Sequence, residues 1–123
     1  MKILVVEDSS SMRAYLTTII EGGTESYDLD IVEASSGFEA LKTLPHHHFD
    51  AILTDINMPD INGLELIGFV KSNPEYKDIP LVIVSTEKSD EDKKRGMALG
   101  ASGYVVKPFT KAELMTAVNR ALG

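Results

Sequence analysis

The sequence predicts a single α/β domain built on a doubly wound parallel sheet, and three observations lead to this class. Short apolar runs alternate with amphipathic segments five times along the chain. Most of the apolar runs are continuous, as in strands that helices cover on both faces. The length of 123 residues suits one domain, and no low-complexity linker or repeated block marks a second. We therefore expect one domain over residues 1–123.

The predicted strands are the apolar runs themselves: Ile3 to Val6, Leu29 to Glu33, Ala51 to Thr54, Leu81 to Ser85 and Gly103 to Val106. In a sheet of this kind right-handed crossovers join the strands, and ligands bind outside the carboxyl ends of the strands. Functional residues are therefore expected directly after each strand.

The first and last helices are predicted from two apolar stripes, each on one helical face. The stripes are Met12, Leu16, Ile19 and Ile20, and Leu114, Val118, Ala121 and Leu122. Three of the helix starts pair an oxygen side chain with a glutamate three residues later, the pattern of a capping box. These pairs are Ser36 with Glu39, Asn62 with Glu65, and Thr110 with Glu113.

Helix ends are marked by Pro45 and Pro74, which close the second and third helices, and by Gly100, which suits a left-handed cap on the fourth. The fourth helix, roughly Asp90 to Leu99, has few apolar residues and an internal Gly96. Its packing on the sheet should therefore be the weakest of the five, as suits a mobile output element.

Composition excludes several classes of protein. The chain has 43% hydrophobic and 25% charged residues, which is ordinary for a globular protein. Its formal charge of −7 would repel a nucleic-acid backbone, so direct nucleic-acid binding is not expected. There is no cysteine, and the apolar stretch at the start is too short for a signal peptide. We expect a cytoplasmic protein with no membrane association.

Chemically active side chains follow four of the predicted strands: Glu7-Asp8, Asp55, Ser85-Thr86 and Lys107-Pro108. Each is an ordinary loop residue when taken alone. Together, three carboxylates at one edge would repel one another by a few kcal/mol per pair at about 4 Å in a surface dielectric. A divalent cation would offset this repulsion, and Mg²⁺ suits carboxylates that leave room for phosphate oxygens.

An aspartate beside a cation, a lysine and a hydroxyl can accept a phosphoryl group as an aspartyl phosphate. Asp55 is then the expected nucleophile, with Glu7 and Asp8 holding the metal. Lys107 would pair with the phosphate, and Ser85 would donate a hydrogen bond to it. The loop Met58-Pro59 to Asn62-Gly63 would delay the next helix so that the chain can wrap the metal, although ordinary loop punctuation explains Pro59 and Gly63 equally well.

The stretches "VVEDSSSMR", "DAILTDINMPDINGLEL", "VIVSTE" and "GASGYVVKPFT" together resemble the receiver domain of two-component response regulators. The resemblance covers essentially the whole chain. The last motif, with Asn57 and Glu87, is most similar to the stand-alone chemotaxis regulators. The resemblance implies a flavodoxin-like fold with strand order 2-1-3-4-5. It favours a stand-alone module, as do the start at Met1 and the end just past the fifth helix.

The resemblance also implies roles for individual residues. Asp55 would take phosphate from a histidine kinase, and the main-chain carbonyl of Asn57 would join Glu7, Asp8 and Asp55 around Mg²⁺. Ser85 and Tyr104 would form a switch that reshapes the face made by helix four, strand five and helix five, where a downstream protein binds. The Lys107-Pro108 bond is expected to be cis. Asn57 and Glu87 would tune dephosphorylation. Such a protein catalyses only its own phosphorylation and dephosphorylation.

Other functions compete with this hypothesis. A phosphorelay intermediate or a phosphate-independent interaction module would have a similar sequence. An aspartate-nucleophile phosphatase is a weaker alternative, because such enzymes place a second acid where this chain has Asn57. Flavin mononucleotide in the Ser9 to Ser11 loop is disfavoured by the adjacent acids. His46, His47 and His48 suggest a metal, but adjacent loop residues cannot all face one ion, so a solvated loop is the better interpretation.

Overall fold

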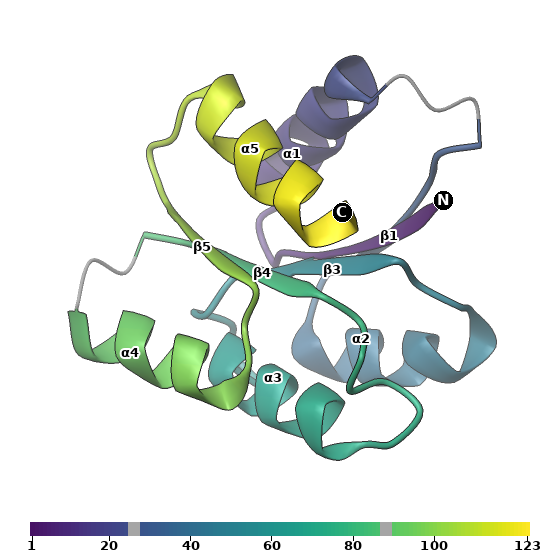
Figure 1. Cartoon of the computed structure of the whole chain (residues 1–123), viewed down its shortest axis with the longest axis vertical. Coiled ribbons are helices and arrows are strands. Elements are labelled where there is room, and N and C mark those ends of the chain that lie inside the picture. Colours follow the sequence, from purple (N-terminus) through teal and green to yellow (C-terminus); the bar gives the residue numbers. More distant parts are fainter. Residues whose placement is uncertain (25–27, 87–89) are drawn as a thin grey trace.

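The computed structural model describes residues 1–24, 28–86 and 90–123. Its five parallel strands are β1 (Lys2–Val6), β2 (Asp30–Ala34), β3 (Ala51–Thr54), β4 (Leu81–Ser85) and β5 (Gly103–Val106). They form one sheet in the order β2-β1-β3-β4-β5, so the implied order is confirmed (Figure 1). The predicted bounds differ at the start of β1 and at both ends of β2, because the parallel ladder between these strands begins at the pair of Lys2 and Asp30 and ends at the pair of Val6 and Ala34.

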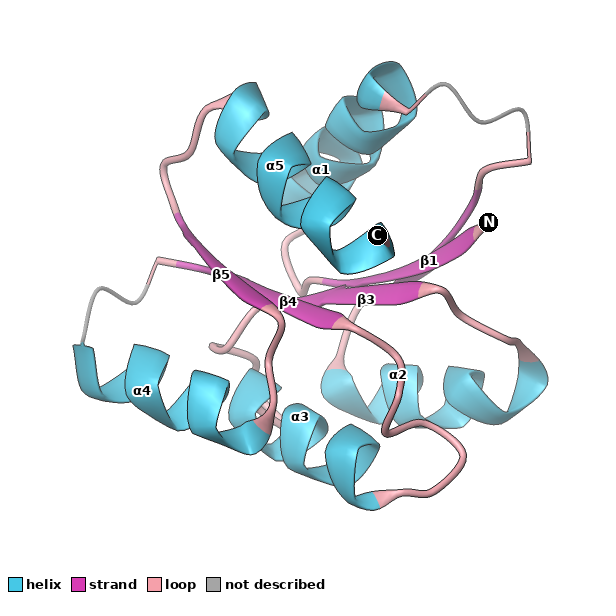
Figure 2. Cartoon of the chain, in the orientation of Figure 1, coloured by secondary structure: helices cyan, strands magenta, loops and turns pink. Residues whose placement is uncertain are grey.

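The helices are α1 (Ser10–Gly23), α2 (Gly37–Thr43), α3 (Gly63–Ser72), α4 (Asp90–Leu99) and α5 (Lys111–Leu122), and a short 3-10 turn, Leu44–His46, follows α2. Figure 2 shows α1 and α5 on one face of the sheet and α2, α3 and α4 on the other. In the described residues no helix is long and apolar enough to cross a membrane.

Two apolar layers form the core because successive residues of each strand point to opposite faces of the sheet. On the α1 and α5 side, Ile3, Val5 and Leu53 pack against Leu16 and Leu114. The opposite layer lies under α2, α3 and α4 and includes Leu4, Ile52, Ile83, Leu66 and Ile67. The predicted stripe of α1 is largely buried, and in α5 Leu114 and Val118 are fully buried. Burial of the strands on both faces explains their continuous apolar sequence.

The predicted capping boxes form at two of three helix starts. Asn62 with Glu65 and Thr110 with Glu113 each make both reciprocal hydrogen bonds. At α2, Ser36 accepts the N–H of Glu39, but the Glu39 carboxylate instead accepts the hydroxyl of Ser35 at 2.6 Å and its N–H at 3.3 Å. That part of the prediction is wrong because Ser35 offers the carboxylate two donors in place of one. These hydrogen bonds lower the pKa of Glu39.

Helix α4 has the predicted bounds and is followed by Gly100 in the left-handed region, with φ of 114°. Among its described residues only Gly96 is buried, whereas α3 buries five residues. The side chain of Ile83 occupies the space in which a Cβ of Gly96 would lie. Helix α4 is therefore held to the sheet mainly through close backbone approach, in agreement with its apolar-poor sequence.

Candidate functional site

The predicted site residues from β1, β3 and β5 meet at the carboxyl edge of the sheet. Glu7, Asp55 and Lys107 each directly follow the last residue of a strand. Main-chain hydrogen bonds continue the ladder there: Asp55 N–H donates to Val6 O at 3.1 Å, and Lys107 N–H donates to Ser85 O at 2.8 Å. These hydrogen bonds hold the main chain of Asp55 and Lys107 in place, so the starting positions of their side chains are fixed by the sheet.

Lys107 joins the two buried carboxylates. Its Nζ lies 2.9 Å from Glu7 Oε2 and 3.5 Å from Asp55 Oδ2. The exposed fractions are 2% for Glu7, 7% for Asp55 and 9% for Lys107, so water screens these charges little. The lysine was predicted to approach a phosphate at Asp55, and in this structure its shorter contact is to Glu7.

Glu7 is held by neighbours that the sequence analysis did not assign. Its Oε1 accepts the N–H of Ser9 at 3.2 Å, and its carbonyl oxygen accepts a hydrogen bond from Arg13 Nη1 at 2.7 Å. Burial raises the pKa of Glu7, and the hydrogen bond from Lys107 opposes that rise. Ser9 also caps α1 by accepting the N–H of Met12, which gives the serine loop a structural role. An arginine in the first turns of a helix that follows an acid is the signal that could have identified Arg13.

Glu7, Asp8 and Asp55 form the one group of potential metal ligands found among the described residues. Each offers a carboxylate oxygen, and these oxygens lie within 4.8 Å of one another. Asp8 is exposed whereas the other two are buried, so the group opens to solvent on one side. Mg²⁺ prefers hard oxygen donors and binds directly through one or two carboxylates while keeping several waters, which the open side of this group can admit. The donor set therefore fits the predicted cation.

The loop after β3 presents Asp55 to this group. Asp55 Oδ1 accepts the N–H of Asn57 at 3.3 Å, and the next residue, Met58, is buried. Gly63 then begins α3 against the end of β3, where a Cβ would overlap the carbonyl oxygen of Asp55. Of the two interpretations left open for Gly63, this contact favours a specific role, because any side chain would push the helix away from Asp55.

Ser85 and Tyr104, the two residues of the switch hypothesis, lie on the neighbouring strands β4 and β5. Ser85 ends β4 and is fully buried, and Tyr104 of β5 is partly buried and packs against the core beneath α4. The Lys107-Pro108 bond is cis, as the resemblance implied. Glu87, predicted to tune dephosphorylation, lies outside the described residues.

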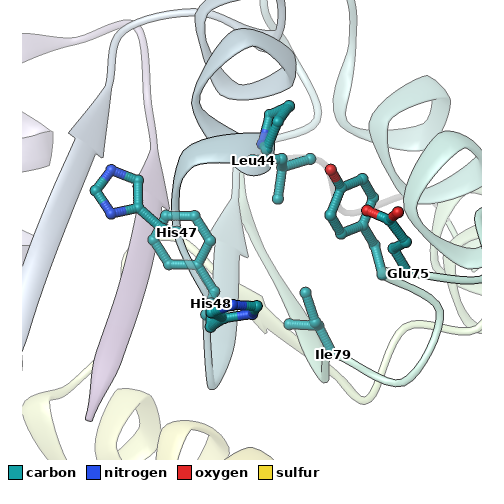
Figure 3. Close-up of a pocket in the computed structure, with 8 residues that line it drawn as sticks. Leu44, His47, His48, Glu75 and Ile79 are labelled. Carbon is teal, nitrogen blue, oxygen red and sulfur yellow. The ribbon is translucent and has the colours of Figure 1, made fainter.

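The histidine run lies in the segment between α2 and β3, at the start of β3 and so at the opposite end of that strand from Asp55. His47 Nδ1 contacts Lys2 Nζ at 3.0 Å, and His48 is exposed. Figure 3 shows the rings of His47 and His48 lying apart beside a cavity of about 430 Å³ that Leu44, Glu75 and Ile79 also line. The predicted solvated loop is thus only partly right, because His46 ends a 3-10 turn and His47 is half-buried against Lys2.

A comparison with known families narrows the remaining classes of function. The sequence model described as "Response regulator receiver domain" matches residues 3–119. The chain belongs to this family. Receiver domains of this kind are signalling switches of two-component systems, so this membership favours a signalling role over a metabolic enzyme.

Individual receivers of known identity resemble the chain over its full length. A chemotaxis protein CheY homolog of Campylobacter jejuni is 37% identical, covering all of this chain and 93% of its own. Chemotaxis protein CheY1 of Helicobacter pylori is 38% identical, covering all of this chain and 98% of its own. The structure of Vibrio cholerae CheY4 superposes with a TM-score of 0.87 at 35% identity, covering 98% of both chains. The predicted fold class is therefore confirmed.

Proposed function

We propose that residues 1–123 form one receiver unit that is phosphorylated on Asp55 by a histidine kinase and then binds a downstream protein. The observation that carries this proposal is the position of Lys107, whose ammonium contacts Asp55 and Glu7 together at the buried sheet edge. The similarity of the whole chain to chemotaxis regulators supports a signalling role of this kind.

In the proposed reaction an oxygen of the Asp55 carboxylate attacks the phosphorus of a phosphohistidine or of a small phosphodonor. A P–O bond to Asp55 forms as the bond from phosphorus to the donor breaks. From phosphohistidine the P–N bond breaks, and the imidazole leaves with the electron pair and takes up a proton. From an acyl phosphate the P–O bond breaks, and the carboxylate leaves with the electron pair. The N–H of Asn57, which donates to Oδ1, keeps one carboxylate oxygen oriented. The nearby Lys107 ammonium would pair with the negative charge that the phosphoryl oxygens bring.

Glu7, Asp8, Asp55 and the carbonyl of Asn57 are the residues that would hold Mg²⁺. When bound, the ion would shield the charge of the transferring phosphoryl group. The three clustered carboxylates support this assignment. A structural relative described as the Mn²⁺-bound form of response regulator Rcp1, 25% identical with a TM-score of 0.81, adds support for a divalent ion in this family.

The output surface is proposed to be the face of α4, β5 and α5. β5 is an edge strand of the sheet, and a groove of about 500 Å³ between β5 and α5 is lined by residues that include Tyr104, Glu113 and Arg120. Ser85 is proposed to move toward the phosphoryl group while Tyr104 turns inward. The two residues could be linked in this way because Ser85 ends β4 and Tyr104 lies in the neighbouring strand β5. Asn57, exposed beside Asp55, would help to set the lifetime of the phosphoryl group.

Intact-mass spectrometry after incubation with acetyl phosphate tests the proposal directly. The wild-type chain should gain one phosphoryl group in the presence of Mg²⁺ and none after chelation. Asp55→Asn should gain none because the amide is not a nucleophile. Asp78→Asn is the matched control, since Asp78 is exposed in the loop before β4 and its removal should leave the modification unchanged.

An unmodified wild type, under conditions in which another receiver is modified, would contradict the proposal. The chain would then be a phosphate-independent interaction module. An adduct that survives in Asp55→Asn would place the modification elsewhere, and peptide mapping would locate it.

A further inference from the structure

Asp60 ties the loop that follows β3 to the start of α2. Its Oδ2 accepts the N–H of Phe38 at 3.0 Å, although the two residues are 22 positions apart in the chain. Phe38 lies in the first turn of α2, where main-chain N–H groups lack partners within the helix. Asp60 thus satisfies a donor of a different element, and its side chain is directed at α2 and not at the acidic group.

A second contact presses the same loop against α2. A Cβ at Gly37, the first residue of α2, would lie 2.5 Å from the carbonyl oxygen of Ile61 and 2.7 Å from its Cβ. The main chain next to Asp60 therefore lies directly on the helix start. Hydrogen bonds from main-chain N–H groups, first that of Ile61 and also that of Phe38, lower the pKa of Asp60, as expected for a carboxylate that serves as an acceptor.

The other end of the loop is also fixed. Asp55 is hydrogen-bonded into the ladder through its N–H, and Gly63 packs against its carbonyl group. Asn57 lies between these two anchored ends, with an exposed side chain and with its N–H on Asp55 Oδ1. The position of the Asn57 carbonyl therefore depends on both ends of the loop.

We propose that Asp60 is a positioning residue for Mg²⁺, which sets the place of the Asn57 carbonyl relative to Glu7, Asp8 and Asp55 by holding the loop on α2. This inference rests on the proposed metal site. Mg²⁺ demands nearly ideal octahedral geometry, so a carbonyl displaced by a loosened loop binds it less well. Outer-shell groups of this kind commonly control the affinity of a metal site without touching the ion.

The test is a titration of the ¹⁵N-labelled chain with Mg²⁺ alone, followed by the amide shifts of residues around Asp55. Asp60→Ala should raise the Kd for Mg²⁺ by about tenfold, at the low end of outer-shell effects. Asp60→Asn should stay within about twofold of wild type, since an asparagine oxygen caps a helix about as well as an aspartate oxygen. The spectra themselves report whether each variant is folded.

Ser36→Ala is the matched control. Ser36 caps α2 by accepting the N–H of Glu39, a hydrogen bond that does not involve the loop after β3. Its loss weakens the same helix start without releasing Asp60, so the Kd for Mg²⁺ should not change.

Three results with the variants would overturn the inference. The first is an unchanged Kd in Asp60→Ala. The second is an Asp60→Asn variant as weak as Asp60→Ala, which would assign the effect to lost charge. The third is a Ser36→Ala variant that reproduces Asp60→Ala, which would assign it to stability of α2. Failure of the proposed metal site itself is distinct, because it would be visible as a wild-type chain that binds no Mg²⁺, and it would overturn the inference as well.

Discussion

Replacing Gly63 by alanine tests how the loop after β3 presents Asp55. A Cβ at this position would overlap the carbonyl oxygen of Asp55 and lie 2.9 Å from both its carbonyl carbon and the Cα of Ile56. All three are main-chain atoms, so no side-chain rotation can relieve the overlap. Either α3 or the end of β3 must shift, and both are packed in the core through residues such as Leu66 and Leu53.

The size of the effect follows from the cost of overpacking, about 1–3 kcal/mol for a buried site that cannot yield easily. Gly68 on the same helix provides the matched control, because a Cβ there meets no atom within 4 Å. Gly68→Ala should stabilise the chain by about 0.5–1 kcal/mol, since alanine loses less backbone entropy in a helix. A glycine-to-alanine substitution is therefore expected to destabilise the fold at position 63 and to stabilise it at position 68.

Urea unfolding followed by far-ultraviolet circular dichroism is the assay, since the chain has no tryptophan. With a urea m value of about 2 kcal/mol/M, the midpoint should fall by about 0.5–1.5 M in Gly63→Ala and rise by about 0.2–0.5 M in Gly68→Ala. The initial rate of phosphorylation by acetyl phosphate should also fall in Gly63→Ala. A midpoint equal to wild type in Gly63→Ala, alongside a stabilised Gly68→Ala, would refute the close-approach argument.

Four further predictions follow from the contacts. The hydrogen bond from the Ser35 hydroxyl is the main cause of the lowered pKa of Glu39. The ionised Glu39 therefore stabilises the folded state at pH values above its ordinary pKa of 4.5, and this contribution is lost as the pH falls through the lowered pKa of the folded state. Ser35→Ala should therefore destabilise the chain at pH 7, with a difference from wild type that shrinks in unfolding curves below pH 4.5. Mg²⁺ should raise the Tm of the wild type and do so less in Asp8→Asn, as scanning calorimetry would measure. Thr110→Ala should cost about 1 kcal/mol in urea unfolding by removing the cap of α5. Hydrogen exchange should be faster in α4 than in α5 and should change in α4 when a phosphoryl mimic binds; equal protection of the two helices would contradict the weak packing of α4.

The elements that could be predicted from sequence are those whose side chains report burial directly. Continuous apolar runs predicted β3, β4 and β5 to the residue. Every residue of β3 and β4 is buried, and in β5, which is an edge strand, the apolar run is unbroken although only Val105 is buried. β2 is an edge strand with an exposed first residue, so its apolar pattern is weaker and its predicted start at Leu29 was one residue early. The positions of the acids and the lysine were predictable because a polar residue that directly follows a buried parallel strand lies at the carboxyl end of the sheet.

The contacts that escaped prediction depend on how elements meet in space. The spacing of Glu39 after Ser36 predicts a capping box, but whether the carboxylate reaches Ser36 or Ser35 is decided by local geometry. Asp60 acts on a main-chain N–H of another element, which no residue pattern marks, whereas the position of Arg13 after the acids was a signal that went unused. Gly63 is required because its main chain lies against that of Asp55. It does not have the left-handed conformation that often marks a required glycine.

The shorter contact of Lys107 has a consequence for the proposed reaction. Three carboxylates and one ammonium leave the group of Glu7, Asp8, Asp55 and Lys107 with two net negative charges when all are ionised. A phosphoryl group on Asp55 would add more negative charge, and a Lys107 ammonium drawn toward it would lengthen its 2.9 Å contact with Glu7. Glu7 is buried and would then be a carboxylate left without its ammonium partner, which is costly in a protein interior. A cation held by Glu7 and Asp8 would supply the charge that Lys107 withdraws. Lysine and metal therefore have separate tasks in this proposal, and neither can replace the other.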